Sequence, residues 1–331
     1  MLDPLFNSQW LNNLLTFRWF QFIFILLTTI LATTKITLQS AACRKHIRNS
    51  QDSILYNTLF FASVALFLSL TLTMGNPNAE ILLWAFMIAA MTVMFQVMYS
   101  IALAEGPVSI TVLIINFSVV LPTIISAIVF KERIFISQII GLACLLISFP
   151  LSMKESHDGE KKASGKWFII TIITLIANSL GTTLVKLFKL TDSYINQPQG
   201  TDFASNTLLL FIYIFGSSLA LTVYYFRRMF GSKEHGANKH TFRLGKSVLL
   251  FASGMGLVLA VYQKCNITAN MKIDGSILFP TYSGLSSVIM TAVGIILFGD
   301  RLNKRQWLGI IFGIFAVVLL NIKFGVSFAL C

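Results

Sequence analysis

Long apolar runs dominate the sequence and set its fold class. A helix that crosses a bilayer needs about 20 mostly apolar residues. Ten runs of this kind can be counted, at 19–40, 54–74, 80–103, 108–130, 134–152, 167–189, 204–226, 246–266, 274–298 and 306–323. The alternation expected of a transmembrane barrel is absent. The sequence therefore predicts an all-α polytopic membrane protein with ten transmembrane helices.

Composition agrees with this interpretation. Of the 331 residues, 56% are hydrophobic and only 11% are charged, whereas soluble domains carry about 25% charged residues. The mean hydropathy is +0.77. Most of the chain is therefore expected to face lipid or protein rather than water, and the lipid bilayer is the first predicted partner.

One segment of the first half recurs near the C-terminus. Residues 105–141 contain an apolar run that ends in three charges, Lys131-Glu132-Arg133, and residues 274–309 repeat this layout. At one constant offset the coinciding pairs are Phe130 with Phe298, Glu132 with Asp300, Arg133 with Arg301, Gln138 with Gln306 and Gly141 with Gly309. The recurrence predicts two copies of one helical unit.

A polar linker at 154–165 lies between these copies, with five runs before it and five after it. The predicted domains are thus 1–153 and 166–331. The N-terminal segment 1–17 is either a short interfacial helix or an extension of the first span. An odd number of spans in each half makes the halves enter the membrane in opposite senses, which is the inverted repeat of many secondary transporters.

The positive charge is distributed as in a membrane protein. The net charge of +12 could suggest a nucleic-acid partner, but the basic residues sit between apolar runs. Loops after odd-numbered runs carry twice as many Lys and Arg residues as those on the other side. Because positive loops stay in the cytoplasm, we predict that these loops lie inside the cell, that both termini lie outside, and that no nucleic acid is bound.

No motif of cofactor or metal chemistry is present in the sequence. The four cysteines and four histidines show no spacing of a disulfide framework or a metal site. There is no P-loop or dinucleotide-binding glycine pattern, and no signal-peptide pattern precedes the first run. We therefore predict no cofactor and no enzymatic activity.

The acidic residues argue against one class of transporter. All 13 lie in the tail, in loops or at the edges of runs, whereas a proton antiporter of the small multidrug type needs a carboxylate within the membrane. This favours a facilitator or exchanger of a neutral or anionic metabolite. The hypothesis fails if an imposed pH gradient drives uptake into proteoliposomes.

Polar residues inside apolar runs are the candidates for a substrate site, because a polar group in hydrocarbon is costly unless it is paired or lines water. Lys35 and Lys186 lie late in the first helix of each half. Both could meet an anionic or carbonyl-bearing substrate in a central cavity. The alternative is that each lysine extends its ammonium to the membrane interface.

Other candidates share helix faces or could shape a gate. Gln96 lies one turn from Tyr99 on the third run, and Tyr262 lies one turn from Asn266 on the eighth. The remaining cavity candidates are Asn116, Asn178 and Tyr282, and hydrogen bonding between helices is the alternative role for all of them.

Pro122 and Pro280 each remove a backbone hydrogen bond, so each could bend its helix near a gate or form a static kink. The small residues Ser253-Gly254 and Gly256 are predicted to serve close helix packing.

Several of these motifs resemble a known family. The segment Gly106-Pro107-Val108-Ser109-Ile110-Thr111, the later Pro122 and Lys131-Glu132-Arg133 resemble the first repeat of EamA-type transporters of the drug/metabolite transporter superfamily. In the second half, Asn178, Lys186, the segment 266–272 and Phe279-Pro280 are similar to the family as well. The resemblance implies a ten-helix carrier in which helices one to four and six to nine enclose a central cavity. The peripheral fifth and tenth helices are candidates for a homodimer contact. Many family members have cytoplasmic termini, which disagrees with the charge distribution.

These observations favour a secondary transporter in the cell membrane that moves a small metabolite by alternating access. The substrate class stays open between amino-acid-like, sugar-like and nucleotide-like compounds. The alternatives are a proton-coupled multidrug or amino-acid exporter and, less in keeping with two inverted halves, a receptor or scaffold.

Overall fold

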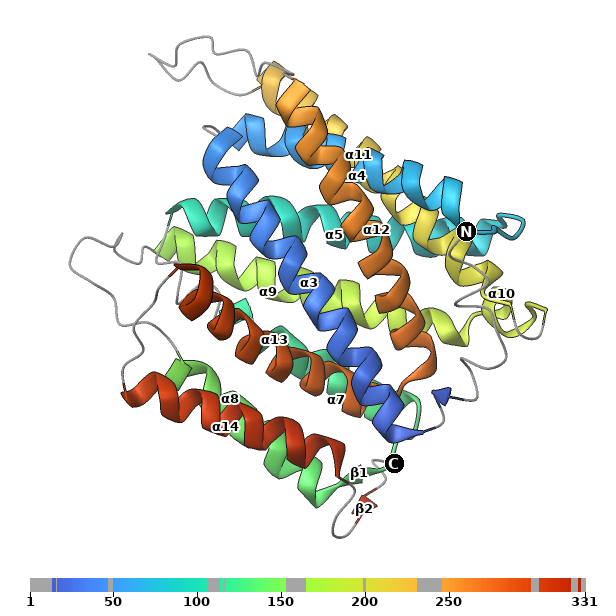
Figure 1. The fold of residues 1–331 in the computed structure, drawn as a ribbon. Helices are drawn as coiled ribbons and strands as arrows, with labels where there is room; N and C mark the ends of the chain where they lie inside the picture. Colours follow the sequence, from blue (N-terminus) through green and yellow to red (C-terminus); the bar gives the residue numbers. More distant parts are fainter. Residues whose placement is uncertain are drawn as a thin grey trace.

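The computed structural model describes residues 14–15, 17–46, 50–105, 114–115, 117–152, 165–198, 201–230, 246–298, 304–322 and 327–328. Nearly all of this part of the chain is helical (Figure 1). The long helices are α3 (Arg18–His46), α4 (Ser50–Thr71), α5 (Ala79–Glu105), α7 (Val120–Val129), α8 (Ile136–Ser152), α9 (Gly165–Leu187), α11 (Phe203–Phe230), α12 (Lys246–Lys272), α13 (Gly275–Phe298) and α14 (Lys304–Asn321).

Short elements connect some of these helices. They are the 3₁₀ turns η1 (Phe117–Val119) and η2 (Phe188–Leu190), the helix α10 (Asp192–Ile195), and the strands β1 (Ile134–Phe135) and β2 (Ser327–Phe328). The two strands pair antiparallel, with Ile134 opposite Phe328. This pairing joins the loop after α7 to the C-terminal segment.

A helical element lies at each predicted apolar run, with η1 and α7 standing for the described part of the fourth run. The ends differ from prediction. Helix α12 continues to Lys272 instead of ending near residue 266, because the polar residues of its last turns are buried and hydrogen-bonded. Within the described ranges four helices are long and apolar enough to cross a membrane, over Ile54–Thr71, Ala79–Tyr99, Gly165–Leu190 and Phe203–Phe226. Ten crossings in two inverted halves remain a prediction.

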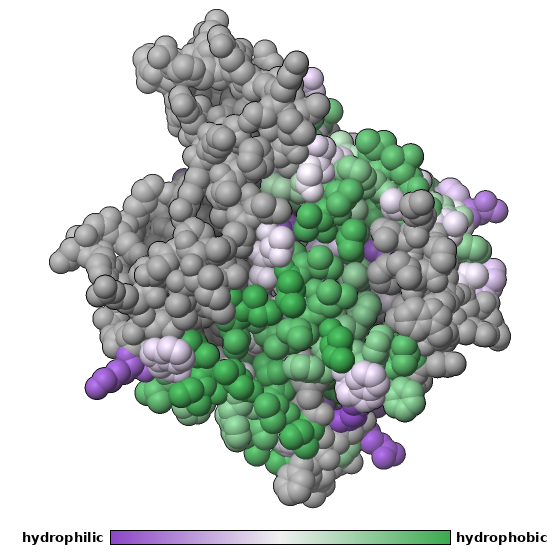
Figure 2. Space-filling model, in the orientation of Figure 1, coloured by the Kyte–Doolittle hydropathy of each residue, from purple (hydrophilic) through white to green (hydrophobic). Residues whose placement is uncertain are grey.

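The outer surface of the described helices is largely apolar. Large hydrophobic side chains are exposed along α3, α8 and α14, among them Trp19, Ile139 and Trp307. Figure 2 shows hydrophobic residues over much of the face in view and hydrophilic residues toward its edges. Such a surface is unfavourable in water and is the one that lipid contact requires.

The helices pack in pairs that run the length of the molecule. Helix α8 lies beside α14 at one edge of the bundle, α5 beside α9, α4 beside α11, and α3 beside α12 (Figure 1). The largest apolar cluster lies between α4, α5, α11 and α12 and includes Tyr56, Phe60, Leu208 and Leu259. A second cluster joins α3, α12 and α13 around Ile25, Ala269 and Leu278. Helix α12 thus contributes to both clusters.

Close helix contact at Gly256 gives a first testable expectation. A Cβ atom at Gly256 would lie 2.2 Å from the Ser63 Oγ of α4, whereas a Cβ atom at Gly254 would meet nothing within 4 Å. Overpacking costs about 1–3 kcal/mol. Gly256→Val is therefore expected to lower the melting temperature of the purified protein, while Gly254→Ala should leave it unchanged or raise it. Equal melting temperatures for the two variants would contradict the packing of α12 on α4.

Some predicted features fall outside the described residues. These are Asn116, Ser109, Asp300 and nearly all of the segment 1–17 and of the linker 154–165. The proposed domain division therefore stays a prediction.

Candidate functional site

Three amide side chains form a polar stripe on one face of α12. Gln263, Asn266 and Asn270 follow one another at spacings of three and four residues, so their side chains lie on one side of the helix. Asn266 Nδ2 donates to Gln263 Oε1 at 3.3 Å. Asn270 Nδ2 donates to the carbonyl oxygen of Asn266 at 2.9 Å and to its Oδ1 at 3.3 Å. Gln263 Nε2 in turn donates to the Tyr213 hydroxyl of α11. We call Gln263, Asn266 and Asn270 the amide stripe.

The amide stripe ends in an open acceptor. Asn270 is only 2% exposed, yet its Oδ1 has no hydrogen-bond partner. Burying an unpaired amide oxygen costs about 1–3 kcal/mol. A ligand that donates a hydrogen bond to this oxygen would recover that energy. Asn57 Oδ1 and Thr268 Oγ1 are buried and unpaired as well, but only Asn270 continues a row of three amides on one helix face, so we take the stripe as the candidate binding site.

Tyr262 and Tyr282 meet beside the stripe, which the sequence did not indicate. Their hydroxyl oxygens lie 3.0 Å apart, one on α12 and the other on α13. Tyr262 immediately precedes Gln263, and Tyr282 lies two residues after Pro280. Two of the predicted candidates are thus brought together, and they link the stripe to α13.

Asn178 reaches the described part of the fourth run. Its Nδ2 donates to Ser118 Oγ at 2.7 Å, and the hydroxyl of the next residue, Ser179, donates to the Ser118 carbonyl oxygen at 3.0 Å. The Ser118 carbonyl belongs to η1, whose backbone departs from regular α-helix. These bonds satisfy backbone and side-chain groups that would be costly if left unpaired in hydrocarbon.

Lys186 is held by protein groups. Its ammonium donates to the carbonyl oxygen of Ile273 at the end of α12 and lies 4.0 Å from Glu132 Oε1. It also lies over the Phe130 ring, 5.5 Å from the centroid. Lys186 is 2% exposed, so its charge is balanced inside the protein.

The Glu132 side chain is only 8% exposed, although the residue follows α7 in a loop. Its Oε1 accepts from Gly275 N at 2.9 Å and its Oε2 from Ser276 N at 2.8 Å, so the carboxylate caps the start of α13. Desolvation and the nearby Glu132 carboxylate raise the pKa of the Asp274 carboxyl above its ordinary value, and the Lys186 ammonium opposes this shift. The predicted charge cluster 131–133 is thus a connection between distant elements.

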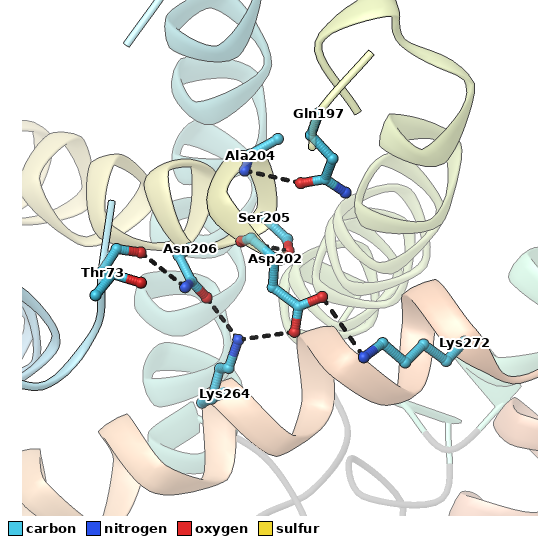
Figure 3. A network of polar contacts seen from close by, with 8 residues as sticks. All are labelled: Thr73, Gln197, Asp202, Ala204, Ser205, Asn206, Lys264 and Lys272. Atoms are coloured by element: carbon cyan, nitrogen blue, oxygen red, sulfur yellow. Dashed lines mark hydrogen bonds and ion pairs between the residues drawn. The ribbon is translucent and has the colours of Figure 1, made fainter. Parts of the chain in front are cut away.

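A second buried ion pair anchors α12 to α11 (Figure 3). Lys264 is 0% exposed, and its ammonium lies 3.2 Å from Asp202 Oδ2 and 2.5 Å from Asn206 Oδ1. Lys272 lies 3.5 Å from the other oxygen of Asp202. Asn206 Nδ2 donates to the Thr73 carbonyl oxygen at 2.9 Å, which ties α4 into the same network. Both Lys264 and Lys272 belong to α12, and Lys264 lies in the protein interior.

The remaining candidates are placed as follows. Lys35 on α3 lies over the Phe60 ring of α4, 6.0 Å from the centroid. Gln96 on α5 is 6% exposed, and the Tyr99 ring stacks on Phe95 of the same helix at 5.5 Å. These contacts place Lys35 against α4 and Tyr99 against its own helix.

The two prolines differ in position. Pro122 lies in the first turn of α7, directly after η1, where a missing N–H removes no bond within that helix. The irregular backbone of η1 lies in the turn before Pro122, where a proline ring disturbs a helix. Whether this irregularity serves a gate or is a static kink stays a prediction. Pro280 lies inside α13, which continues past it to Phe298.

An apolar exterior around a core that contains buried polar networks is typical of a helical membrane protein, and comparison with known proteins agrees. The chain is 22% identical over 213 residues to the probable glucose uptake protein GlcU of Bacillus anthracis. This match covers 62% of the chain and 65% of the relative, just under two thirds of its length. The probable glucose uptake protein GlcU of Bacillus cereus (strain ATCC 10987 / NRS 248) is also 22% identical, over 220 residues that cover 64% of this chain and 67% of that relative.

One solved structure resembles the whole fold. A crystal structure described only as that of a protein has a TM-score of 0.64 and 11% identity, and the match covers 91% of this chain and 96% of that chain. At this identity the likeness shows the fold alone. No family model matches the chain, so the EamA resemblance stays a prediction, whereas a weak similarity to probable glucose uptake proteins is established.

Proposed function

We propose that the chain is a secondary transporter of a small neutral sugar, embedded in the cell membrane. The observation that carries this proposal is the amide stripe on α12, which ends in the unpaired and buried Asn270 Oδ1. Amide groups both donate and accept hydrogen bonds, and a sugar hydroxyl does the same. An uncharged polyol therefore suits this stripe better than an ion does.

The buried lysines support a neutral substrate. Lys186 lies 4.0 Å from Glu132, and Lys264 lies 3.2 Å from Asp202. Removing either ammonium from its carboxylate to bind a substrate anion would leave a buried charge unpaired, which costs several kcal/mol. The predicted contact of Lys186 with an anionic substrate is thus less favourable than its present contacts.

The similar proteins point the same way. Both curated relatives carry the description of a glucose uptake protein, and a hexose presents several hydroxyl groups to a polar stripe. We therefore take glucose as the first compound to test, with transport rather than catalysis as the activity.

The packing of the helices supports alternating access between inverted halves. Suppose that each helix of the first half has a counterpart in the second, in the pairs α3 with α9, α4 with α11, α5 with α12, α7 with α13 and α8 with α14. The contact of α3 with α12 then matches the contact of α9 with α5. The contact of α3 with α13 matches that of α9 with α7. Helices α4, α7 and α8 each pack against their own counterparts. This is the pattern that a pseudo-two-fold axis in the membrane plane produces.

Counterflow in proteoliposomes tests the proposal. Vesicles loaded with unlabelled glucose are expected to accumulate external radiolabelled glucose transiently, whereas protein-free vesicles should not. Glucose 6-phosphate, which has the same ring but carries charge, serves as the matched control and should neither exchange nor compete. Exchange of glucose 6-phosphate without exchange of glucose would overturn the neutral-substrate assignment. If no sugar tested exchanges, and none raises the melting temperature of the protein by binding to it, the sugar-transport proposal is contradicted.

A further inference from the structure

The loop after α7 is fastened to the start of α13 by a single carboxylate. Glu132 accepts two backbone N–H groups of α13, from Gly275 and Ser276, and the Ser126 hydroxyl of α7 at 3.0 Å. The first N–H groups of a helix have no partner within that helix, so they are open to water or to a capping group. A carboxylate placed there also interacts favourably with the helix dipole.

Lys186 joins this contact from a third helix. It lies on α9, 4.0 Å from Glu132, and donates to the Ile273 carbonyl oxygen at the end of α12. Four helices, α7, α9, α12 and α13, therefore converge on one buried ion pair. The side chain of Glu132 is 8% exposed and that of Lys186 is 3% exposed, so this end of the bundle is sealed from solvent at the pair.

Gly275 shows how tightly the elements meet here. A Cβ atom at this position would lie 2.1 Å from Ser126 Oγ and 2.8 Å from the Phe279 ring. The turn between α12 and α13 is thus in close contact with the end of α7. Asn270, the last residue of the amide stripe, precedes this turn by one helical turn. The seal therefore adjoins the end of α12 that carries the open acceptor.

We propose, on the basis of the transport function above, that Glu132 is the latch that closes this end of the substrate path. When the carboxylate caps α13, the ends of α7 and α13 are held together and the stripe is shut off from that side of the membrane. When the carboxylate leaves Gly275 and Ser276, water solvates both partners and the two helix ends separate. Lys186 stays with Glu132 as its counter-ion and limits the cost of the buried charge. Such an element with two discrete arrangements is what alternating access requires.

Cysteine accessibility tests the latch without depending on any substrate. The native Cys43, Cys144, Cys265 and Cys331 are replaced, and Asn266→Cys supplies a reporter in the stripe. A membrane-impermeant thiol reagent is then added to one side of the vesicles at a time. An Arg133→Cys variant of the same background identifies the side on which the latch lies, because Arg133 is exposed.

Glu132→Gln and Glu132→Ala are expected to raise the labelling rate of the reporter from the latch side by about tenfold or more, since loss of charge-assisted bonds shifts a two-state equilibrium. The matched control is Glu80→Gln. Glu80 Oε2 also accepts a backbone N–H, from Ser193 at 2.9 Å, but it joins α5 to the segment after α9, and α5 and α9 already pack together along their length. Its removal should leave the labelling rate unchanged. An unchanged rate in both Glu132 variants, or an equal rise in Glu80→Gln, would overturn the latch.

A second arm covers the case in which the Glu132 variants fail to fold, and it leaves Glu132 in place. Arg133→Cys and Asp274→Cys, at exposed positions next to Glu132 and Gly275, are combined in the cysteine-free background and bridged with a short, reducible bifunctional thiol reagent. The bridge is expected to stop glucose counterflow, and reduction should restore it. Undiminished counterflow across the bridge rejects the latch. The labelling rate does not depend on which substrate is transported. A wrong sugar assignment would therefore abolish counterflow and leave the labelling result intact, whereas a wrong latch would leave the labelling rate unchanged.

Discussion

Replacing Lys264 with methionine is expected to destabilise the folded protein by about 3–5 kcal/mol, the usual cost of removing one member of a buried ion pair. The Lys264 side chain is 0% exposed and that of Asp202 is 10% exposed. Methionine fills a similar volume but leaves the Asn206 Oδ1 without its donor and the Asp202 Oδ2 without its near cation. The melting temperature and the midpoint of chemical unfolding, measured in one detergent, report the loss.

Two companion variants separate charge from shape. The double variant Asp202→Asn with Lys264→Met removes both charges and is expected to recover most of the lost stability, because a buried pair is often replaceable by neutral groups. Lys272→Met removes the more exposed lysine, 15% exposed and 3.5 Å from Asp202, and should cost no more than about 1 kcal/mol. A Lys264→Met protein as stable as the Lys272→Met protein would contradict the buried network in Figure 3.

The helical character of the fold was predictable from the sequence, for a simple reason. In hydrocarbon every backbone group must be paired within its own segment or barrel, so long apolar runs leave few choices. The run at 80–103 coincides closely with α5, and the run at 204–226 coincides with α11. Hydrophobicity alone carries this information, and no knowledge of neighbouring helices is needed.

The candidate site was predicted only in part, because burial of a polar residue depends on which helix lies opposite. Tyr262 and Asn266 were selected and do lie at the amide stripe. Gln263 and Asn270 were missed, although their spacing from Asn266 was visible in the sequence as a polar face on an apolar helix. Placing the end of the eighth run near residue 266 concealed this signal, since Asn270 then fell in a loop.

The burial of charged residues at the ends of runs could not be predicted, for a related reason. Glu132 and Asp202 stand beside polar or charged neighbours, which is the usual appearance of a solvated loop. Their partners, Gly275 and Lys264, are distant in sequence and appear only in the folded chain. A single sequence does not reveal which distant residues pair, so the contacts of Glu132 and Asp202 could be found only from the structure.

Asn270→Leu provides the sharpest separation of function from folding. The substitution removes the buried, unpaired Oδ1 together with the Nδ2 that donates to Asn266. The gain from removing the unpaired oxygen offsets the loss of the donor, each about 1 kcal/mol. The melting temperature should therefore stay close to that of the parent protein. Glucose counterflow, in contrast, should fall by about 10- to 100-fold, since an uncharged hydrogen bond to substrate contributes about 1–3 kcal/mol when its partner is otherwise left unpaired.

Thr268→Val is the matched control for Asn270→Leu. The Thr268 Oγ1 is also buried without a partner, but two residues along a helix place it on the other side of α12. Removing this hydroxyl should be at least as well tolerated by the fold and should leave counterflow unchanged. If both variants retain the parent exchange rate, the open acceptor of Asn270 is not part of the substrate site. If both lose exchange equally, the loss comes from α12 as a whole. Only loss in Asn270→Leu alone, with stability retained, assigns the amide stripe to the substrate, because both variants remove a buried unpaired oxygen of α12 and differ in the face on which it lies.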